Sequence, residues 1–388
     1  MDKKKNIIIF VTIAAYVIAT AISYTIFSKF SVAQKTSVSP LPVAKTGAGN
    51  LAFDQALPKT ESCPLNGAMY STQQKDWWEK HRPLGVMIEN HQDARPQSGL
   101  SSADVIYEAV AEGGITRFLA IFYCQDANPI GPVRSARTYF VDFASEYADF
   151  PLYAHVGGAN ASGPADALSQ LTDYGWTGYN DLNQFSIGFP TFWRDYDRLG
   201  RTVDTEHTMY STTTKLWDVG KKRKLTNVDE KGNTWDKKFV KYSFKDDDTT
   251  SSPASQTIHI EFWKDYTQYF VDWIYDKKLN IYKRNNAGVS HIDNDTKKQL
   301  TTKNIVVLSM QESNAFDGYE NNVHLLYKNK GTGKAQIFVD GKQITGTWRK
   351  DSRVARTLLF DSTGTPIKFD KGTIWFEVLP TTGVIEVK

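Results

Sequence analysis

The strongest hydrophobic pattern of the chain is an uninterrupted apolar run near its beginning. Asn6–Phe27 contains 22 residues and no charged side chain, and about 20 residues suffice to cross the hydrocarbon core of a membrane as a helix. Three lysines, Lys3, Lys4 and Lys5, precede the run, so the positive-inside rule places the N-terminus in the cytoplasm. We therefore expect residues 1–30 to form a transmembrane signal anchor, with the bulk of the chain extracytoplasmic.

A cleavable signal peptide is the alternative interpretation of this run. Ser31-Val32-Ala33 has the small-x-small pattern of a cleavage site, but the apolar region of a signal peptide usually has only about 7–15 residues. No cysteine follows closely, so a lipid-modified cysteine is not expected. Residues 31–60 are rich in Ser, Thr, Ala, Pro and Gly and lack periodicity, which predicts a flexible stalk.

The next part of the chain mixes two periods of hydrophobic spacing. Alternating or continuous apolar positions predict strands, and apolar positions three and four apart predict helices. The predicted strands are Leu84–Glu89, Asp104–Ala111 and Ile115–Cys124, and the predicted helices are Ser135–Tyr147 and Pro164–Tyr174. We assign residues 61–220 to a mixed α+β domain.

From residue 257 onward the pattern becomes β-rich, after a charged excursion or linker over residues 221–256. Short apolar runs alternate with turn residues, and Asp340-Gly341 lies between two of them as a two-residue hairpin signal. The spacing predicts an antiparallel sheet or small barrel of about seven or eight strands over residues 257–388. The expected fold class is α+β.

Charge changes this picture only at the N-terminus. The chain has a formal charge of +3, but residues 1–60 hold seven lysines and two aspartates. The remaining 328 residues hold 39 positive and 41 negative side chains. The folded part is therefore near neutral, which argues against a broad basic face and a nucleic-acid partner. The two cysteines, Cys63 and Cys124, could form one disulfide in an exported protein.

Glu108 and Glu112 are candidates for acid–base chemistry. If the Gly-Gly pair after Glu112 turns a two-residue hairpin, period-2 alternation places Glu108, Glu112 and Arg117 on one face. Acids four positions apart on a strand lie about 13 Å apart, too far for a glycosidase pair, which needs about 5–9.5 Å. One of them could act as general acid/base with a partner elsewhere. A charge-compensated sheet face is the alternative.

Arg134 and Arg137 lie three positions apart at the start of a predicted helix, with Ser135 as a plausible N-cap. Two guanidinium groups at such a place suit a carboxylate or phosphate. That anion could be an external ligand or an acid of the same chain.

His155 and His207 are possible bases, although a lone histidine is more often structural. No motif for zinc, a nucleotide or a nucleophile elbow is present, so no metal and no cofactor are expected.

The motifs ENHQDARPQSGLSSADVIYEAVAEGGITRF, GPVRSARTYF and YAHVGG resemble the N-terminal domain of the YerB-like family of bacterial envelope proteins. The second half is similar to that family in YKRNNAGVSHID and in GKAQIFVDGKQITGTWRK. The resemblance implies two domains and an N-terminal membrane attachment, in a family of unknown function. The polar residues that match it are Glu89, Asn90, His91, Arg95, Glu108, Glu112, Arg117, Arg134, Arg137 and His155.

These observations favour a membrane-anchored extracytoplasmic protein that binds a cell-envelope component. A peptidoglycan fragment or an envelope protein is the expected partner, bound through a polar pocket of the first domain. Glu112, Glu108 and His155 are the candidate catalytic residues of the first alternative, an envelope hydrolase or lyase. The second alternative is a protein-interaction platform in which the charged residues form a structural ion-pair network. The candidate ligand-binding residues are Arg134, Arg137, Arg117, Glu89, Asn90, His91, Arg95 and His207.

Overall fold

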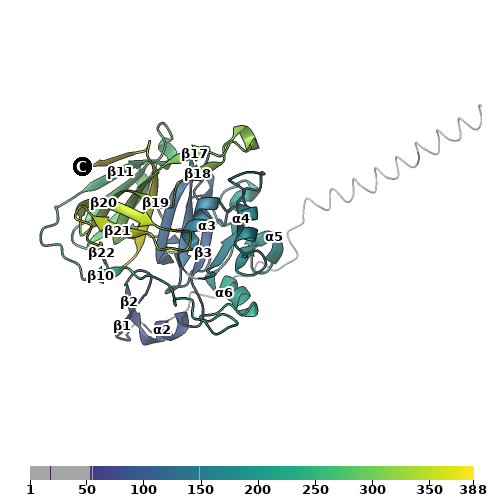
Figure 1. Ribbon diagram of the computed structural model, residues 1–388, viewed down its shortest axis with the longest axis horizontal. Helices are drawn as coiled ribbons and strands as arrows, with labels where there is room; N and C mark the ends of the chain where they lie inside the picture. Colours follow the sequence, from purple (N-terminus) through teal and green to yellow (C-terminus); the bar gives the residue numbers. More distant parts are fainter. Residues whose placement is uncertain (1–17, 19–52, 55, 148) are drawn as a thin grey trace, which may run out of the picture. The chain divides into compact units, whose positions relative to one another are not determined.

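A ten-stranded mixed sheet forms the centre of the fold. The computed structural model describes residue 18 and residues 53–54, 56–147 and 149–388 (Figure 1). The strands of this sheet, in spatial order, are β21 (Leu358–Asp361), β20 (Lys342–Lys350), β19 (Gly331–Val339), β16 (Asn304–Met310), β23 (Ile374–Pro380), β4 (Val105–Glu112), β5 (Ile115–Phe122), β3 (Leu84–Glu89), β6 (Leu152–His155) and β7 (Asp181–Asn183).

Strands from both halves of the sequence share this sheet. The join is the parallel pair β23 and β4, in which Glu377 lies beside Glu108. Five strands of the second half therefore extend the sheet of the first half instead of forming a separate sheet or barrel. The expected hairpin is present between β19 and β20. Asp340 and Gly341 both have positive φ there, as a two-residue turn requires.

The remaining strands of the second half form a six-stranded antiparallel sheet. Alternating apolar residues of β11 and β12, such as Ile258, Ile260, Val271 and Trp273, are buried, and the residues between them are not. One face of this sheet therefore packs into the protein. Its strands are β11 (Thr257–Glu261), β12 (Val271–Asp276), β13 (Ile281–Asn286), β14 (Val289–Ser290), β15 (Thr301–Thr302) and β24 (Val384–Val387).

Four short strand pairs complete the β structure of the described residues. They are β1 (Lys59–Ser62) with β2 (Met69–Ser71), β8 (Trp193–Arg194) with β9 (Met209–Tyr210), β10 (Ser243–Lys245) with β22 (Lys368–Asp370), and β17 (Glu312–Asn314) with β18 (Leu325–Tyr327).

The α-helices of the described residues are short and belong to the first half of the chain. They are α2 (Thr72–Trp78), α3 (Thr138–Ala144), α4 (Ala167–Asp173), α5 (Gln184–Ile187) and α6 (Thr213–Lys222). Helix α3 begins three residues later than the pattern suggested, and Arg137, with an extended backbone, occupies the N-cap position. Ser135 is therefore not the cap.

The two faces of the ten-stranded sheet have different neighbours. On one face, the Tyr107 ring stacks between Phe143 of α3 and Phe376 of β23, at centroid distances of 4.8 Å and 4.6 Å. On the other face, Trp375 of β23 meets Trp273 of the six-stranded sheet at 5.0 Å. Residues of β4 thus point alternately toward the helices and toward the second sheet.

A β-bulge near the end of β4 changes the face on which Glu112 lies. Glu112 pairs with Ile115 as expected, but the register shifts between Val110 and Glu112, so that Glu108 pairs with Phe118. The extra residue places Glu112 on the helix face and leaves Glu108 facing the second sheet. The prediction that both acids share one face with Arg117 is therefore wrong for Glu108.

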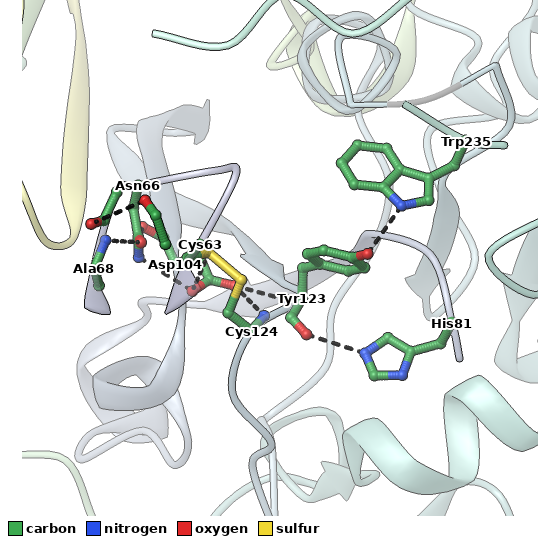
Figure 2. Close-up of a disulfide and its surroundings, with 10 residues drawn as sticks. Cys63, Asn66, Ala68, His81, Asp104, Tyr123, Cys124 and Trp235 are labelled. Carbon is green, nitrogen blue, oxygen red and sulfur yellow. Dashed lines mark hydrogen bonds between the residues drawn. A yellow bond between two sulfur atoms is a disulfide. The ribbon is translucent and has the colours of Figure 1, made fainter. Parts of the chain in front are cut away.

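A disulfide between Cys63 and Cys124 joins the start of the described body to the end of β5, as the sequence allowed (Figure 2). Beside it, the buried Asp104 accepts hydrogen bonds from the backbone N–H groups of Tyr123 and Cys124 at 2.7 and 2.8 Å. Burial nevertheless raises the pKa of Asp104 to about 7. The disulfide and a hydrogen bond from Asn66 Nδ2 to Asp104 at 3.1 Å hold the segment around β1 against the main sheet.

The predicted membrane span, Asn6–Phe27, lies outside the described residues apart from Ile18, and so does most of the predicted stalk. No helix in the described part of the chain is long and apolar enough to cross a membrane. Asn50–Lys388 form one compact unit, and the boundaries 61–220, 221–256 and 257–388 stay predictions.

Candidate functional site

The first cluster of candidate residues lies where β4 and β5 meet the start of α3. Arg117 donates from Nη2 to Glu112 Oε1 at 3.0 Å, and Arg137 donates from Nη2 to the other oxygen, Oε2. The two guanidinium groups are buried, whereas 24% of the Glu112 side chain is exposed. We call Glu112, Arg117 and Arg137 the rim cluster.

The rim cluster contains two cations and one anion. Burial lowers the pKa of both Arg117 and Arg137, because it removes water from the charged guanidinium groups. Each arginine also donates to a backbone carbonyl, of Ser135 and Ala136 respectively. The two Nε atoms have no hydrogen-bond partner among the described residues. An additional anion at this place would offset the excess positive charge.

A second set of charges lies beside the rim cluster, on the same face. Glu89, at the end of β3, pairs in register with Arg117. Its carboxylate accepts from Arg134 Nε at 3.3 Å and lies 2.9 Å from Nδ1 of His207. Arg134 also donates to the exposed Glu206 at 3.3 Å. Arg134 and Arg137 thus bind different acids instead of acting as one pair.

The Glu89–His207 contact shifts the pKa of both side chains. The hydrogen bond to Glu89 raises the pKa of His207. Burial by itself would raise the pKa of Glu89, but the hydrogen bond to His207 and the charge of Arg134 hold it below its usual value. The pair therefore favours an ionised Glu89 beside a protonated His207.

His91 is the most exposed histidine of this group, and its ring stacks on that of His207. The centroids are 4.9 Å apart and the planes differ by 5°. Possible ligand atoms of His91, His207 and Asp93 lie within 4.8 Å of one another. However, imidazole lone pairs lie in the ring plane, so nearly parallel rings do not direct them at one ion. We therefore assign no metal to this cluster, and the expectation that none is needed stays a prediction.

The second half of the chain contributes residues to this region that the sequence did not reveal. The backbone of His324 forms a bridge with Glu112. The His324 ring stacks on the partly exposed Tyr319 at 4.4 Å and pairs with Asp317 at 2.7 Å. The charges of Arg134 and Arg137 both act on the Tyr319 hydroxyl. This loop therefore lies over the rim cluster.

Glu108 lies in a closed interior on the opposite face of the sheet. It forms an ion pair with Arg284 of β13, and both side chains are 0% exposed. Its Oε1 atom also accepts from Thr116 at 2.7 Å. The Arg284 guanidinium packs against the ring of Trp375, 4.9 Å from its centroid. A substrate has no route to this carboxylate, so the structure does not support Glu108 as a general acid or base.

Glu377 completes what we call the interior cluster, Glu108, Arg284 and Glu377. It is fully buried next to Glu108, and its Oε1 atom accepts from Trp273 Nε1 at 2.8 Å. Burial, followed by the negative charge of Glu108, raises the pKa of Glu377 well above its usual value. Two buried acids share one arginine here, and this arrangement favours the protonated form of Glu377.

Asn90 and Arg95 hold the two halves of the chain together. Asn90 donates to Glu108 at 3.2 Å and accepts from Arg95 Nε at 3.0 Å. Arg95 also donates to the backbone carbonyl of Gln268 at 2.8 Å, and its guanidinium lies 5.1 Å from the Tyr269 ring centroid. Burial lowers the pKa of Arg95 to about 10. These contacts give both residues a structural role and leave them little capacity to bind a ligand.

His155 is also fully buried, and both of its ring nitrogens have partners. Nε2 lies 2.7 Å from Asp181, and Nδ1 lies 2.6 Å from the carbonyl oxygen of Gly157. A base needs a free nitrogen within reach of a substrate proton. The geometry therefore does not support His155 as a catalytic residue.

Comparisons with known proteins match the two halves of the chain to two domains of one family. Residues 69–226 match a family described as the N-terminal domain of a protein of unknown function, DUF3048, and residues 258–376 match the corresponding C-terminal domain. The "Putative lipoprotein YerB" of Bacillus subtilis (strain 168) is 30% identical over 329 residues, which are 84% of this chain and 89% of that protein.

A solved structure shows the same similarity in three dimensions. The crystal structure of the YerB protein from Bacillus subtilis matches with a TM-score of 0.67 and 27% identity, over 84% of this chain and 99% of that one. These matches define a two-domain protein of a family whose function is unknown. The chain belongs to the YerB-like family, as the sequence motifs predicted.

Proposed function

We propose that this chain is an extracytoplasmic protein that binds an anionic fragment of peptidoglycan at the rim cluster. The observation that supports this proposal is the convergence of two buried guanidinium groups on one partly exposed carboxylate. A buried cation without a full counter-charge is costly. A ligand carboxylate would supply the missing negative charge and accept the planar, forked hydrogen bonds that arginine offers.

Glu112 is the internal competitor in this proposal. Its carboxylate occupies the place that a ligand carboxylate would take on Arg137, and it is the exposed member of the cluster. It is the last residue of β4 and directly precedes Gly113 and Gly114, which have positive φ. A ligand would approach from the exposed side and share or replace the Glu112 contacts.

The proposed location rests on separate grounds. The relative from Bacillus subtilis is named as a lipoprotein, and this chain has a long apolar run after three lysines. The disulfide suits an oxidising compartment. We propose that the N-terminal segment attaches the protein to the membrane as a single span and that residues 61–388 lie outside.

Cosedimentation with purified cell-wall sacculi tests the proposal. The full chain is incubated with sacculi, and both the retained protein and the released soluble products are measured. We expect retention without product release, and the same retention after the phosphate polymers have been stripped from the sacculi. If stripping the phosphate polymers abolishes retention, the bound anion is a phosphate of those polymers and not a carboxylate of peptidoglycan. No retention would overturn the proposal.

The same assay tests the hydrolase or lyase alternative. Both Glu112 oxygens are held by arginines, which stabilise the ionised carboxylate and suit a general acid poorly. Release of soluble fragments by the wild type that stops in Glu112→Gln would establish that alternative.

A protein-interaction platform is a second candidate because exposed rings lie near the site. Phe185 and Phe316 are each 77% exposed. Phe185 lies against Gly157, and Asp317, which follows Phe316, lies against Gly163. A protein partner should be lost in a Phe185→Ser, Phe316→Ser double variant that still binds sacculi. If the double variant binds no sacculi but still binds a protein partner, the two rings contact the cell-wall ligand.

A further inference from the structure

A polar cavity opens next to the rim cluster, between the start of α3 and one side of α4. Its volume is about 460 Å³, and its lining includes Thr138, Ser162, Asp166, Gln170, Asp173 and Tyr174. This volume lies within the range of about 300–1,000 Å³ that is usual for small-molecule sites. Helices α3 and α4, which form part of the lining, lie close together in Figure 1.

Two connections place this cavity beside the rim cluster. Thr138, on the cavity wall, directly follows Arg137 in the chain. Gly163, on the opposite side of the lining, lies against Asp317, which pairs with His324. A ligand that reaches Arg137 could therefore extend into the cavity.

The cavity offers hydrogen-bond acceptors and no cation among its lining residues. Asp173 contributes a carboxylate, and Ser162 and Thr138 contribute hydroxyl groups. The Asp166 carboxylate also lines the cavity, but both of its oxygens accept from Ser169 as the N-cap of α4. The Gln170 side-chain oxygen has no hydrogen-bond partner among the described residues. Negative charge at this place repels a carboxylate or phosphate, whereas acceptors suit the hydroxyl and amide N–H donors of a neutral sugar.

The cavity wall is fixed by contacts behind it. The Gln170 amide donates to Tyr174 Oη at 2.9 Å, and that hydroxyl donates to Asp142 at 2.9 Å. The guanidinium of Arg353 lies 3.9 Å from the Tyr174 ring centroid. Because this wall is already ordered, ligand binding costs little conformational entropy there.

We infer that this cavity holds a neutral N-acetylated sugar unit of the same ligand whose carboxylate binds the rim cluster. The inference rests on the proposed function and names the ligand class, a glycan that carries a carboxylate on one side chain. The cations lie at one end of the site and the acceptors lie at the other, so the two ends recognise different parts of one molecule.

Calorimetric titration of the full chain tests this inference. The probe is the neutral tetramer of β-1,4-linked N-acetylglucosamine, which has no charged group. Asp173 is exposed at the end of α4, and we expect Asp173→Ala to weaken binding of the tetramer about tenfold, the effect of one hydrogen bond to a charged group. Ser162→Trp, which fills the cavity, should abolish it.

The matched control is Asp218→Ala, on the exposed side of α6 and outside the cavity lining. It should bind the tetramer as the wild type does. Equal affinity in the wild type and Ser162→Trp, or no binding by the wild type, would overturn the sugar site.

Failure of this inference can be told apart from failure of the proposed function. If sacculi are retained through Arg137 but the neutral tetramer does not bind, only the cavity assignment fails. If the tetramer binds but Arg137→Gln does not affect retention of sacculi, the rim cluster assignment fails.

Discussion

The interior cluster and the rim cluster have opposite imbalances of charge. In the interior, two acids, Glu108 and Glu377, meet one arginine, and all three side chains are fully buried. At the rim, two arginines meet one acid, and that acid is 24% exposed. The clusters lie on opposite faces of the same strand, β4, separated by a bulge.

The two clusters differ in how the imbalance is relieved. A buried acid can take up a proton, and burial beside Glu108 raises the pKa of Glu377, which favours its protonated form. An arginine does not lose its proton under the conditions that proteins experience, so the rim cluster depends on nearby negative charge, which Glu112 and the neighbouring Glu89 supply in part. We propose that a ligand supplies the rest, whereas the interior cluster has a structural role.

Removal of the interior cation should have the largest effect on stability. Arg284→Leu leaves the Glu108 carboxylate buried without its partner, which costs about 3–5 kcal/mol. Denaturant unfolding measures this loss. The double variant Arg284→Leu, Glu108→Gln should recover part of it, because the unpaired charge is gone. An Arg284→Leu protein as stable as the wild type would contradict the assignment of this ion pair.

Glu377→Gln should change how stability depends on pH. The pKa of Glu377 is raised above its usual 4.5 in the folded chain, so above pH 4.5 the folded state binds more protons than the unfolded state. The wild-type free energy of unfolding should then fall as pH rises toward the folded-state pKa, by up to about 1.4 kcal/mol per pH unit.

The glutamine variant lacks this proton and should not show that fall, while its carbonyl oxygen still accepts from Trp273. Unfolding curves between pH 5 and pH 8, compared for the two proteins, check the prediction. Parallel curves would mean that Glu377 is ionised in the folded state.

Glu112→Gln tests the rim side of the comparison. It removes the internal negative charge and leaves Arg117 and Arg137 in place. We expect a carboxylate-bearing muropeptide to bind more tightly, by about tenfold, because it no longer competes with an ionised side chain. Calorimetric titration measures the change. Weaker binding would show that Glu112 contacts the ligand directly.

Sequence patterns predicted much of the local structure, because strand period and turn chemistry are local properties. The strands that contain Glu89 and Arg117 and the Asp340-Gly341 hairpin follow from them. The bulge before Glu112 does not, since an alternating apolar run leaves no sign of one extra residue.

The partners of the charged residues were harder to predict. Arg284 lies 176 positions from Glu108, and Glu377 reaches Glu108 only because β23 pairs with β4. Polar residues at buried positions of predicted strands, such as Glu377 in TIWFEVLP, were the available signal. The internal anion of Arg137 is Glu112, and it reaches this arginine because of the bulge in β4.

The affinity of Arg137→Gln for a muropeptide with a free carboxylate tests the central claim most directly. In this variant Glu112 still accepts the hydrogen bond from Arg117, so the protein should unfold at nearly the wild-type temperature. Arg349→Gln, an exposed arginine of β20, is the matched control. We predict a loss of affinity of tenfold or more for Arg137→Gln, equivalent to about 1.5–3 kcal/mol, and none for the control. Unchanged affinity in a folded Arg137→Gln protein would contradict the account.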